Sequence, residues 1–510
     1  MKKGIVLSLS AIALTTVATQ AGAAENLVEM FKNGKNEGYV RLHHINESTS
    51  RNIAITGSVV GGKLKYETDS LYGLSFGTAI YATHDTGLTN WDNLTKEGYN
   101  QVAGGLMGNK ELGADGRFQG YATIGEAFVQ YAYSKSNVKF GRQEFQSPMT
   151  KSEVTLIPNL YQGVVATVGE IENTKIQAAY ITDMMFGTRA TTEAQLLGDG
   201  AYGITAGAGF GHYRAQDGKQ EFMSMGEAAF GKVEGLPTGV PTYPANGKND
   251  NDNGLMALGV EYGEKGPLAV RVWDYYAKDM FNTLYADVDY KMKLSGAKVM
   301  LSAQVLHQSD VGNFKDSGAA EALNADQTIV GVSHTPSQMD QLYKTKLSEK
   351  DGGIDALYFG LQAKAQIQDF GFLAAYSKNT KGHVIDPWGG NFGYTSTIFS
   401  RNENRADTDA YKLGFNYDFT NLGVEGLKFI YNYGAYKSDV EATAYLAGWS
   451  SGTNAAGGTH TENSHEHDFH LFYQVPSYKK MWVGLFHVER KDDTRQYNQA
   501  HTRLVANVAF

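Results

Sequence analysis

Cysteine is absent from this chain of 510 residues, and proline occurs only nine times. Without cysteine, disulfide bonds and thiolate chemistry are excluded. Beyond its N-terminus the chain has no long apolar run, and its mean hydropathy is −0.36, so the sequence predicts no transmembrane helix. The net charge is −9 and no block is rich in lysine or arginine, which argues against nucleic-acid binding as the main function.

The first residues have the layout of a secretory signal peptide. A pair of lysines precedes a short apolar run, and small residues that suit a cleavage site follow. This run is too short and wrongly flanked for a membrane-spanning helix. We therefore expect a signal peptide over residues 1–23, with cleavage after Ala23 or Ala24, and a single exported domain over residues 24–510.

The last ten residues (HTRLVANVAF) alternate with a period of two, which indicates a strand with two different faces. One face is apolar, and the other carries Arg503 and Asn507. The chain then stops on Phe510, which suits an outer-membrane barrel whose last strand pairs with its first. A soluble edge strand could show the same alternation, so this stretch leaves both readings open.

The same alternation recurs along the chain and predicts eighteen strands. They lie at residues 38–46, 54–67, 71–82, 121–133, 137–142, 160–168, 173–182, 254–262, 268–277, 281–291, 297–307, 354–365, 370–378, 410–419, 427–437, 467–475, 481–490 and 501–510. The 59 glycines, 31 tyrosines and 24 phenylalanines suit the turns and aromatic girdles of a barrel, although secreted β-sandwiches share this composition.

The gaps between these strands alternate between short and long, as at 134–136 and 308–353. A β-sandwich has no reason to sort its loops this way, whereas an up-and-down outer-membrane barrel has short periplasmic turns and long extracellular loops. The gap at 278–280 is an exception because it is short on the outer side. The gap at 183–253 has room for an extra hairpin within residues 202–230, so we expect a barrel of 18 ± 2 strands.

The two faces of the predicted strands differ in polarity. In residues 281–291, Leu284 and Val288 fall on one face, whereas Asp287 and Asp289 fall on the other. A charge on the lipid face would cost roughly 2–4 kcal/mol at the bilayer midplane, so the charged face must line the lumen. A wet lumen in a barrel of this size is a channel.

Charged residues of the inner face are the candidate pore-lining residues. A ladder of basic side chains attracts anionic groups, and facing acids set up a transverse field. The alternative is that these charges only keep the lumen hydrated and pair with one another. The candidates are Arg41, Lys139, Arg271, Asp287, Asp289, Lys364, Lys412, Lys428 and Arg503, and the same face is expected to include Lys63, Lys65, Glu126, Asp418, Asp468 and Glu489.

Residues 143–159 (QEFQSPMTKSEVTLIPN) differ from the other predicted loops. They combine Pro148 and Pro158 with Lys151, Glu153 and several apolar side chains. A loop in water would not need so many apolar groups, but a loop folded into the barrel mouth would bury them against the wall. We therefore expect this constriction loop to narrow the pore, with Lys151 and Glu153 near the narrowest point.

Several motifs resemble the OprD family of Gram-negative outer-membrane porins. They are KFGRQ from residue 139, SP from 147, IPNLYQG from 157, AYKLGFNYDF from 410 and GVEGL from 423, and the layout of residues 467–510 is also similar. The resemblance implies an eighteen-stranded barrel, an inward third loop at 143–159, a basic ladder on one lumen wall, and a role for Phe510 in recognition for assembly. Because KSEV stands where members often have an acid and an arginine before the proline, the substrate preference stays open.

Two motifs look like metal sites but lack the required pattern. In HEHDFH (465–470), His465 and His467 share one face of a strand, whereas His470 points the other way. The segment 249–254 starts like a calcium loop, but its twelfth position is Val260 where a glutamate is needed. No nucleophile elbow or catalytic dyad stands out. We therefore expect no metal, no cofactor and no enzymatic activity.

These observations predict an outer-membrane porin, a passive channel for small hydrophilic solutes that favours anionic or carboxylate-bearing ones. Its expected partners are outer-membrane lipid and lipopolysaccharide, the outer-membrane assembly machinery and the solutes, but not nucleic acid. A homotrimer is left open. The alternatives are a barrel that acts as an adhesin or enzyme, and a FadL-type transporter of hydrophobic compounds. The last needs an N-terminal hatch, for which residues 25–37 are too few.

Overall fold

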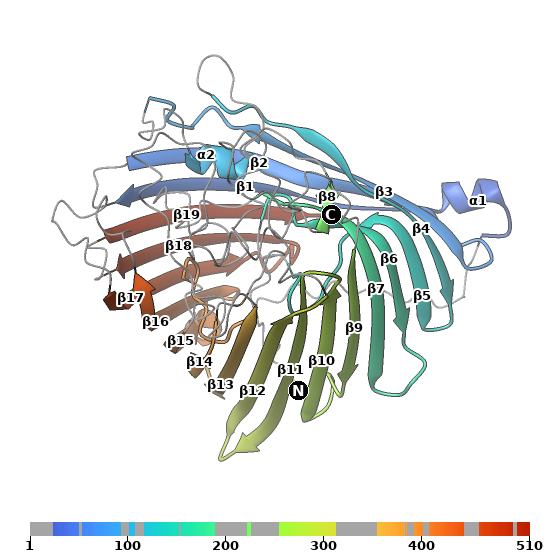
Figure 1. The fold of residues 1–510 in the computed structure, drawn as a ribbon. Coiled ribbons are helices and arrows are strands. Elements are labelled where there is room, and N and C mark those ends of the chain that lie inside the picture. Colours follow the sequence, from blue (N-terminus) through green and yellow to red (C-terminus); the bar gives the residue numbers. More distant parts are fainter. Residues whose placement is uncertain are drawn as a thin grey trace, which may run out of the picture.

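The computed structural model describes residues 24–49, 54–92, 101–107, 117–151, 155–188, 222–225, 254–312, 354–382, 384, 392–400, 407–442, 458–492 and 497–510. Within these ranges the chain forms one antiparallel sheet that closes on itself (Figure 1). The sheet has nineteen strands, and because β8 contributes only two residues, eighteen long strands make up the wall. The predicted eighteen-stranded all-β barrel is confirmed.

The long strands follow one another around the wall in chain order. Their bounds are β1 (Lys35–Thr49), β2 (Ala54–Glu67), β3 (Leu74–Asp85), β4 (Ala122–Tyr133), β5 (Ser136–Gln143), β6 (Leu160–Val168), β7 (Thr174–Met185), β9 (Leu255–Tyr262), β10 (Leu268–Ala277), β11 (Phe281–Leu294), β12 (Ala297–Asp310), β13 (Asp355–Ile367), β14 (Phe370–Asn379), β15 (Thr408–Asp418), β16 (Leu427–Ala442), β17 (Gly458–Gln474), β18 (Met481–Asp492) and β19 (Tyr497–Ala509). Each predicted strand overlaps one of these.

The short elements are β8 (Met223–Ser224), α1 (Leu27–Lys32), α2 (Gln101–Leu106) and the 3-10 helix η4 (Phe419–Leu422). None of the described helices is long and apolar enough to cross a membrane. The expected signal peptide over residues 1–23 lies outside the described residues. Most of the extra hairpin expected within residues 202–230 also lies outside them, and β8 falls in its described part.

β1 and β19 pair and close the barrel. Their register runs from Tyr39 opposite Ala509 to Thr49 opposite Gln499. Beyond this ladder, the N–H of Phe510 donates to the carbonyl of Gly38 at 3.0 Å, and the N–H of Gly38 donates back at 3.3 Å. A Cβ at Gly38 would lie 2.3 Å from the Lys63 carbonyl oxygen and 2.7 Å from the Phe510 ring, so only a glycine fits there. Closure removes the open edges that a flat sheet would expose.

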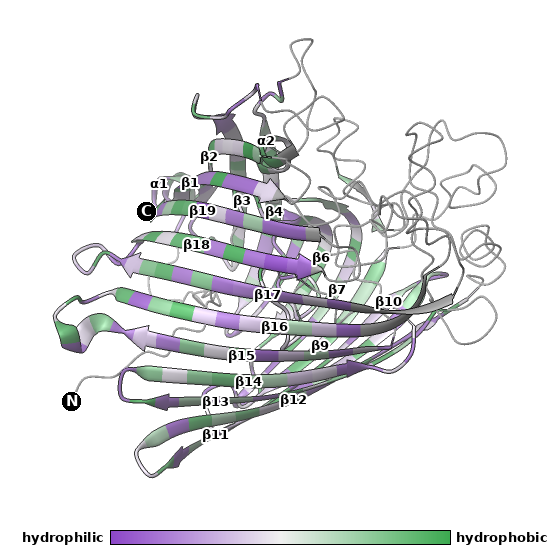
Figure 2. Ribbon diagram, turned by 90° about the vertical axis from the view of Figure 1, so that its left-hand side faces the viewer, coloured by the Kyte–Doolittle hydropathy of each residue, from purple (hydrophilic) through white to green (hydrophobic). Residues whose placement is uncertain are grey.

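Large apolar side chains gather on the outer face of the wall. In β9, Met256 and Leu258 are 53% and 54% exposed, whereas Leu255 and Ala257 on the inner face are buried. Figure 2 shows hydrophobic and hydrophilic residues alternating along the strands around the wall. An exposed apolar belt of this extent suits a hydrocarbon environment rather than water.

Short turns join the strands at one end of the barrel (Figure 2). Most connections at the other end are longer, and the exceptions there are 50–53, 278–280 and 493–496. Glu170 ties two of the short turns together. Its carboxylate accepts from the Lys135 N–H at 2.8 Å and from the Ser136 hydroxyl at 3.1 Å. The backbone hydrogen bond from Lys135 is the main reason that the pKa of Glu170 lies below its usual value.

Candidate pore and its constriction

The nine candidate pore-lining residues lie on the inner face of the wall. In β13, Phe359 and Leu361 are 43% and 58% exposed and mark the outer face, so Lys364 lies on the inner face with the buried Tyr358. The same comparison with exposed neighbours places Arg41, Lys139, Arg271, Asp287, Asp289, Lys412, Lys428 and Arg503 inside. Their role in conduction stays a prediction.

Acidic side chains neutralise two of these cations. Arg271 Nε lies 2.7 Å from Asp287 Oδ1, and Arg271 Nη2 lies 2.8 Å from Asp289 Oδ2. Lys428 Nζ lies 3.2 Å from Asp418 Oδ2. Arg271 and Lys428 are therefore largely compensated and add little net positive field to the lumen.

A second group of charges lies on the wall formed by β1 to β4. The buried Glu126 lies 3.8 Å from Lys63 and 3.4 Å from Lys65. Lys63 is also 3.3 Å from Glu144, at the start of the constriction loop. The Tyr81 hydroxyl is within hydrogen-bond distance of both carboxylates, at 2.8 Å from Glu126 and 3.1 Å from Glu144. This network fixes the first residues of the loop to the wall.

Arg41, Lys139 and Lys364 are different, because none of them forms an ion pair with a carboxylate in the part of the chain that the structure describes. Arg41 Nε donates to the Asn507 side-chain oxygen at 2.9 Å. Lys139 Nζ lies over the Phe128 ring, 4.2 Å from its centroid. The charges that act on Lys364 are those of Lys412 and Asp289, and Asp289 is not in ion-pair contact with it. These three side chains therefore carry positive charge on the inner wall without a carboxylate in ion-pair contact, although Glu144 lies near Arg41 and Lys139, and Asp289 lies near Lys364.

The constriction loop packs against the inner face of β10. The Tyr275 hydroxyl donates to Ser147 Oγ at 2.9 Å, and the Met149 N–H donates to the Tyr275 oxygen at 3.4 Å. The Phe145 ring lies edge-on to Trp273 with centroids 6.1 Å apart. Phe145 and Met149 are buried, as expected for a loop folded against the wall.

The far end of the same loop reaches β1, about halfway round the sheet from β10. The Leu156 carbonyl accepts from the Tyr39 hydroxyl at 2.9 Å, and the Thr155 carbonyl accepts from Arg41. The loop therefore crosses the lumen between nearly opposite parts of the wall. The other predicted loop residues lie along this path, with Pro148 and Lys151 next to the β10 contact and a buried Pro158 after the β1 contact, whereas Glu153 lies outside the described residues.

A second segment, residues 392–400 between β14 and β15, also lies against the inner wall. Glu466 on β17 holds it. One oxygen of Glu466 accepts from the Phe399 N–H at 2.8 Å. The other accepts from the Ser400 N–H at 2.9 Å and from the Ser400 hydroxyl at 2.6 Å. Three donors on one buried carboxylate fix the end of the segment.

Further contacts extend this docking along the wall. The Ile398 N–H donates to Asp468 Oδ2 at 3.2 Å, and Lys412 donates to the Ser396 carbonyl. Gly434 leaves the space that the segment fills, since a Cβ there would lie 2.5 Å from the Thr397 methyl carbon.

A barrel whose outer face suits lipid, and whose lumen is crossed by one inward loop and lined by a second inward segment, has the architecture of a diffusion channel. The outer membrane porin family OprD matches residues 241–510, which is more than half of the chain. The chain belongs to the OprD family. As an OprD-family porin it lies in the outer membrane, where small solutes pass through the barrel.

Solved structures have the same fold at low sequence identity. OccK1 (OpdK) of Pseudomonas aeruginosa is 16% identical, with a TM-score of 0.60, and the alignment covers 94% of this chain and 99% of that one. OccK8 (OprE) of the same organism is 13% identical, with a TM-score of 0.64 and coverage of 94% and 99%. OccAB3 of Acinetobacter baumannii is 14% identical, with a TM-score of 0.63 and coverage of 94% and 100%. No curated protein matches the chain.

The inward position of residues 392–400 was not predicted from the porin's sequence. A signal for it exists in the HEHD motif, where Glu466 and Asp468 fall on the inner face of β17 and His465 and His467 fall on the outer face. Two adjacent inner acids need donors, and the loop amides supply them. Within the described ranges, no group of three or more metal-ligating side chains is present.

One inner-face prediction for this porin is wrong. Glu489 lies on the outer face of β18 with the exposed Leu485, and its side chain is 57% exposed. The inner residues of β18 are Phe486, Val488 and Arg490, all of them buried. The error arises because the outer face of β18 is itself partly polar near its end, so alternation of polarity alone assigns the wrong face.

Proposed function

We propose that this porin is a passive channel that favours small anionic solutes, in particular those that carry a carboxylate. The observation that carries the proposal is an imbalance of charge inside the barrel. Arg41, Lys139 and Lys364 have no carboxylate partner among the described residues, whereas the inner acids are held by donors of the protein itself. A positive field in a narrow polar pore concentrates anions.

The inner acids are occupied in several ways. Glu126 lies between two lysines, and Asp287 and Asp289 share Arg271. Glu47 lies 2.8 Å from a histidine ring nitrogen and accepts a hydrogen bond from a glutamine amide at 2.9 Å. A carboxylate that is already paired attracts a passing cation less than a free one does. The uncommitted charge that a solute meets is therefore positive.

The proposal assigns no catalytic step to the barrel, since the family and the similar structures are porins. Flow down a concentration gradient needs neither a cofactor nor an energy source. One of the similar structures is that of P. aeruginosa OpdK with vanillate, a carboxylate, which supports this class of solute. The proposed partners are outer-membrane lipid, lipopolysaccharide and the outer-membrane assembly machinery.

Replacing Lys364 with Gln tests the preference. One unit charge about 6 Å from a passing ion in water contributes roughly 0.7 kcal/mol, so its removal should lower the local anion concentration roughly threefold. We expect the anion-to-cation permeability ratio to fall, as measured by the reversal potential of the purified porin in a planar bilayer under a potassium chloride gradient.

Lys437→Gln is the matched control, because Lys437 lies on the outer face of β16 and is exposed to the surroundings of the barrel. Its reversal potential should equal that of the parent protein. If Lys364→Gln and Lys437→Gln both leave the reversal potential unchanged, the anion preference is rejected, and the channel itself still stands on its measured conductance.

A further inference from the structure

The helix α1 lies on the outside of the barrel wall. The hydroxyl of Tyr66, near the end of β2, donates to the carbonyl of Phe31 at the end of α1. Tyr66 shares the outer face of β2 with Leu64, which is 55% exposed. Figure 1 places α1 beyond the ring of strands, beside β3 and β4. The helix therefore sits next to the apolar belt and not in the lumen.

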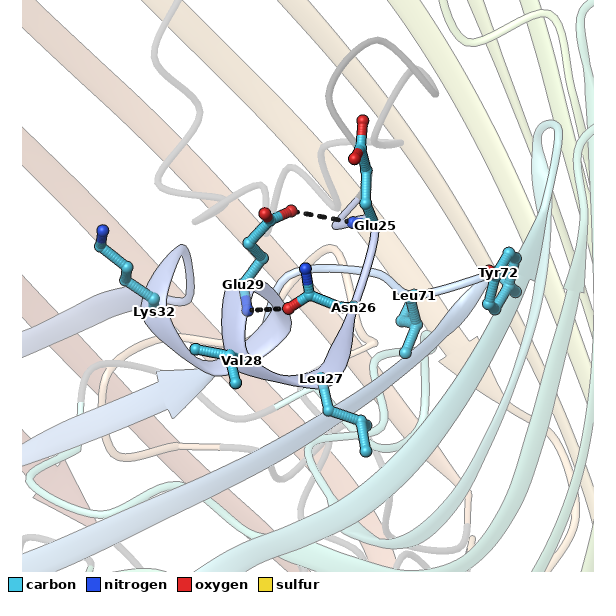
Figure 3. Close-up of a pocket in the computed structure, with 8 residues that line it drawn as sticks. All are labelled: Glu25, Asn26, Leu27, Val28, Glu29, Lys32, Leu71 and Tyr72. Atoms are coloured by element: carbon cyan, nitrogen blue, oxygen red, sulfur yellow. Dashed lines mark hydrogen bonds between the residues drawn. The ribbon is translucent and has the colours of Figure 1, made fainter.

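α1 is held firmly although it is short. The Asn26 side chain caps it by accepting from the Glu29 N–H at 3.0 Å, and Glu29 accepts from the Glu25 N–H at 3.0 Å (Figure 3). The N–H of Asp69 donates to the Met30 carbonyl at 2.9 Å, which ties the helix to the β2–β3 turn. Met30 is fully buried. The exposed side of α1 is therefore an ordered surface.

That exposed side is apolar. Leu27, Val28 and Phe31 are 63%, 75% and 55% exposed, and their spacing puts them on one side of the helix. Tyr72, in the β2–β3 turn, is 85% exposed. Leaving four large apolar side chains in water at one place is costly, so this surface needs a partner.

A pocket of about 860 Å³ lies between α1 and this turn. Apolar side chains from both segments line it, including Leu27, Val28, Leu71 and Tyr72 (Figure 3). Lys32, in the last turn of the helix, is the cationic lining residue, and Asn26 and the carboxylates of Glu25 and Glu29 also line the pocket. The apolar lining side chains match an acyl chain, and the ammonium group of Lys32 can pair with the phosphate of the same lipid.

The patch continues into the lipid-facing surface of the barrel. Leu74 and Tyr131 pair across β3 and β4 on the outer face and are 37% and 49% exposed, and Tyr133 at the end of β4 is 67% exposed. All lie at the end of the barrel with the short turns, which in outer-membrane barrels is the periplasmic end. The partner of the α1 surface must therefore be at the depth of the inner, phospholipid leaflet.

We propose that α1 is a membrane anchor that inserts Leu27, Val28 and Phe31 into the inner leaflet of the outer membrane. The pocket beside Leu71 and Tyr72 takes a phospholipid acyl chain, and Lys32 faces the phosphate. Amphipathic helices bind membrane interfaces in this way, through buried apolar area and attraction to anionic headgroups. The anchor fixes the depth of the β1–β4 side of the barrel and is independent of solute preference.

The absence of cysteine makes a direct test clean, because a single introduced thiol takes the label. Leu27→Cys and Val28→Cys carry a nitroxide in the full chain, reconstituted in liposomes of phosphatidylethanolamine and phosphatidylglycerol. The ratio of collisions with oxygen to collisions with a water-soluble nickel chelate is measured by electron paramagnetic resonance. We expect this ratio to be several-fold higher at both positions than at Glu172→Cys, which reports an exposed turn at the same end.

Leu413→Cys, 57% exposed on the lipid-facing belt, is the standard for lipid contact. Lys32→Cys is the matched control on α1 itself and should give a ratio below those of positions 27 and 28. A ratio at 27 and 28 equal to that at Glu172 overturns the proposal, because the surface is then in water. Low collision rates with both reagents also overturn it, since a second copy of the chain then covers the patch. Each variant must conduct like the parent, which shows that the barrel is folded.

Discussion

Glu466 is the residue on which the docking of residues 392–400 depends most. Its buried carboxylate accepts from two backbone amides and one hydroxyl of the same segment. Hydrogen bonds to a charged acceptor contribute more than neutral ones, and a buried group left without its partner is costly. The position of a whole segment is thus set by one side chain on another strand.

Glu466→Gln should loosen this segment. In either orientation the amide NH₂ group would face a backbone N–H, that of Phe399 or that of Ser400. The variant therefore loses charge-assisted bonds and places donor against donor, which should weaken docking by about 2–3 kcal/mol. We expect a higher mean single-channel conductance and more open-channel noise in a planar bilayer. Glu489→Gln removes the same charge from the outer face of the adjacent strand and should change neither quantity. Identical traces for Glu466→Gln and the parent would refute the role of Glu466.

At the residue level, sequence predicts the face of a side chain better than its partner. Arg41 and Lys364 were placed correctly because each alternates with an apolar residue that the wall exposes. Whether a lumen cation is compensated was not visible, since Asp418 lies on the strand before Lys428 and only the register brings the two within 3.2 Å. Where both faces of a strand carry polar groups, as at Glu489, even the predicted face of the side chain is wrong.

Among the elements, the constriction loop allows the most direct test, because its removal should change the single-channel conductance. It spans from the β10 contacts of Ser147 and Met149 to the β1 contacts of Thr155 and Leu156. Deleting residues 147–155 should remove a crossing of the lumen and raise the single-channel conductance. Removing the buried Met149 should also cost about 1.5–3 kcal/mol of stability.

Met149→Ser separates the two effects of that deletion. It loses the buried side chain but keeps the length of the loop, so its thermal unfolding temperature should fall while its conductance changes far less than in the deletion variant. A deletion variant that folds and conducts like the parent would show that the loop does not narrow the pore.

The strands of this barrel were predictable and the inward segments were mostly not, for a physical reason. Period-two alternation occurs within about ten neighbouring residues, so each strand can be found from local sequence. The docking of residues 392–400 depends on Glu466, which lies 66 residues from its partner Ser400. Likewise, α2 packs where Gly57 leaves room for Val102, a contact between separate segments. For residues 143–159 the apolar content is local, so packing against the wall can be predicted from the sequence, and the narrowing of the pore stays a prediction.

For the whole molecule, two substitutions near the seam between β1 and β19 should separate the requirements for assembly of the barrel from those for ion selectivity. Phe510 packs on Gly38 on the outer face at 47% exposure. Phe510→Asp places a carboxylate near the membrane interface, where the direct cost to stability is about 1 kcal/mol or less. The family resemblance gives this position a role in recognition for assembly, so we expect much less folded barrel in the outer membrane, measured by heat-modifiable migration on gels.

Arg503→Glu, within β19 and seven residues before Phe510, is the contrasting variant. Its side chain lies on the inner face over the Phe486 ring, with the guanidinium carbon 5.1 Å from the ring centroid. This variant should assemble like the parent and shift the reversal potential toward cations. Normal assembly of Phe510→Asp, or failed assembly of Arg503→Glu, would contradict this division.

The pairing of β1 with β19 also constrains the order in which the protein folds. Arg41 and Asn507, which are hydrogen-bonded across the seam, are 466 positions apart in the chain, whereas neighbouring strands elsewhere are joined by hairpins. Loop-closure entropy makes such a contact among the slowest to form. The hairpins can form first, which leaves a curved sheet with two open edges until β1 pairs with β19. That intermediate is the species most prone to aggregation, and closing the seam is the step that ends its exposure.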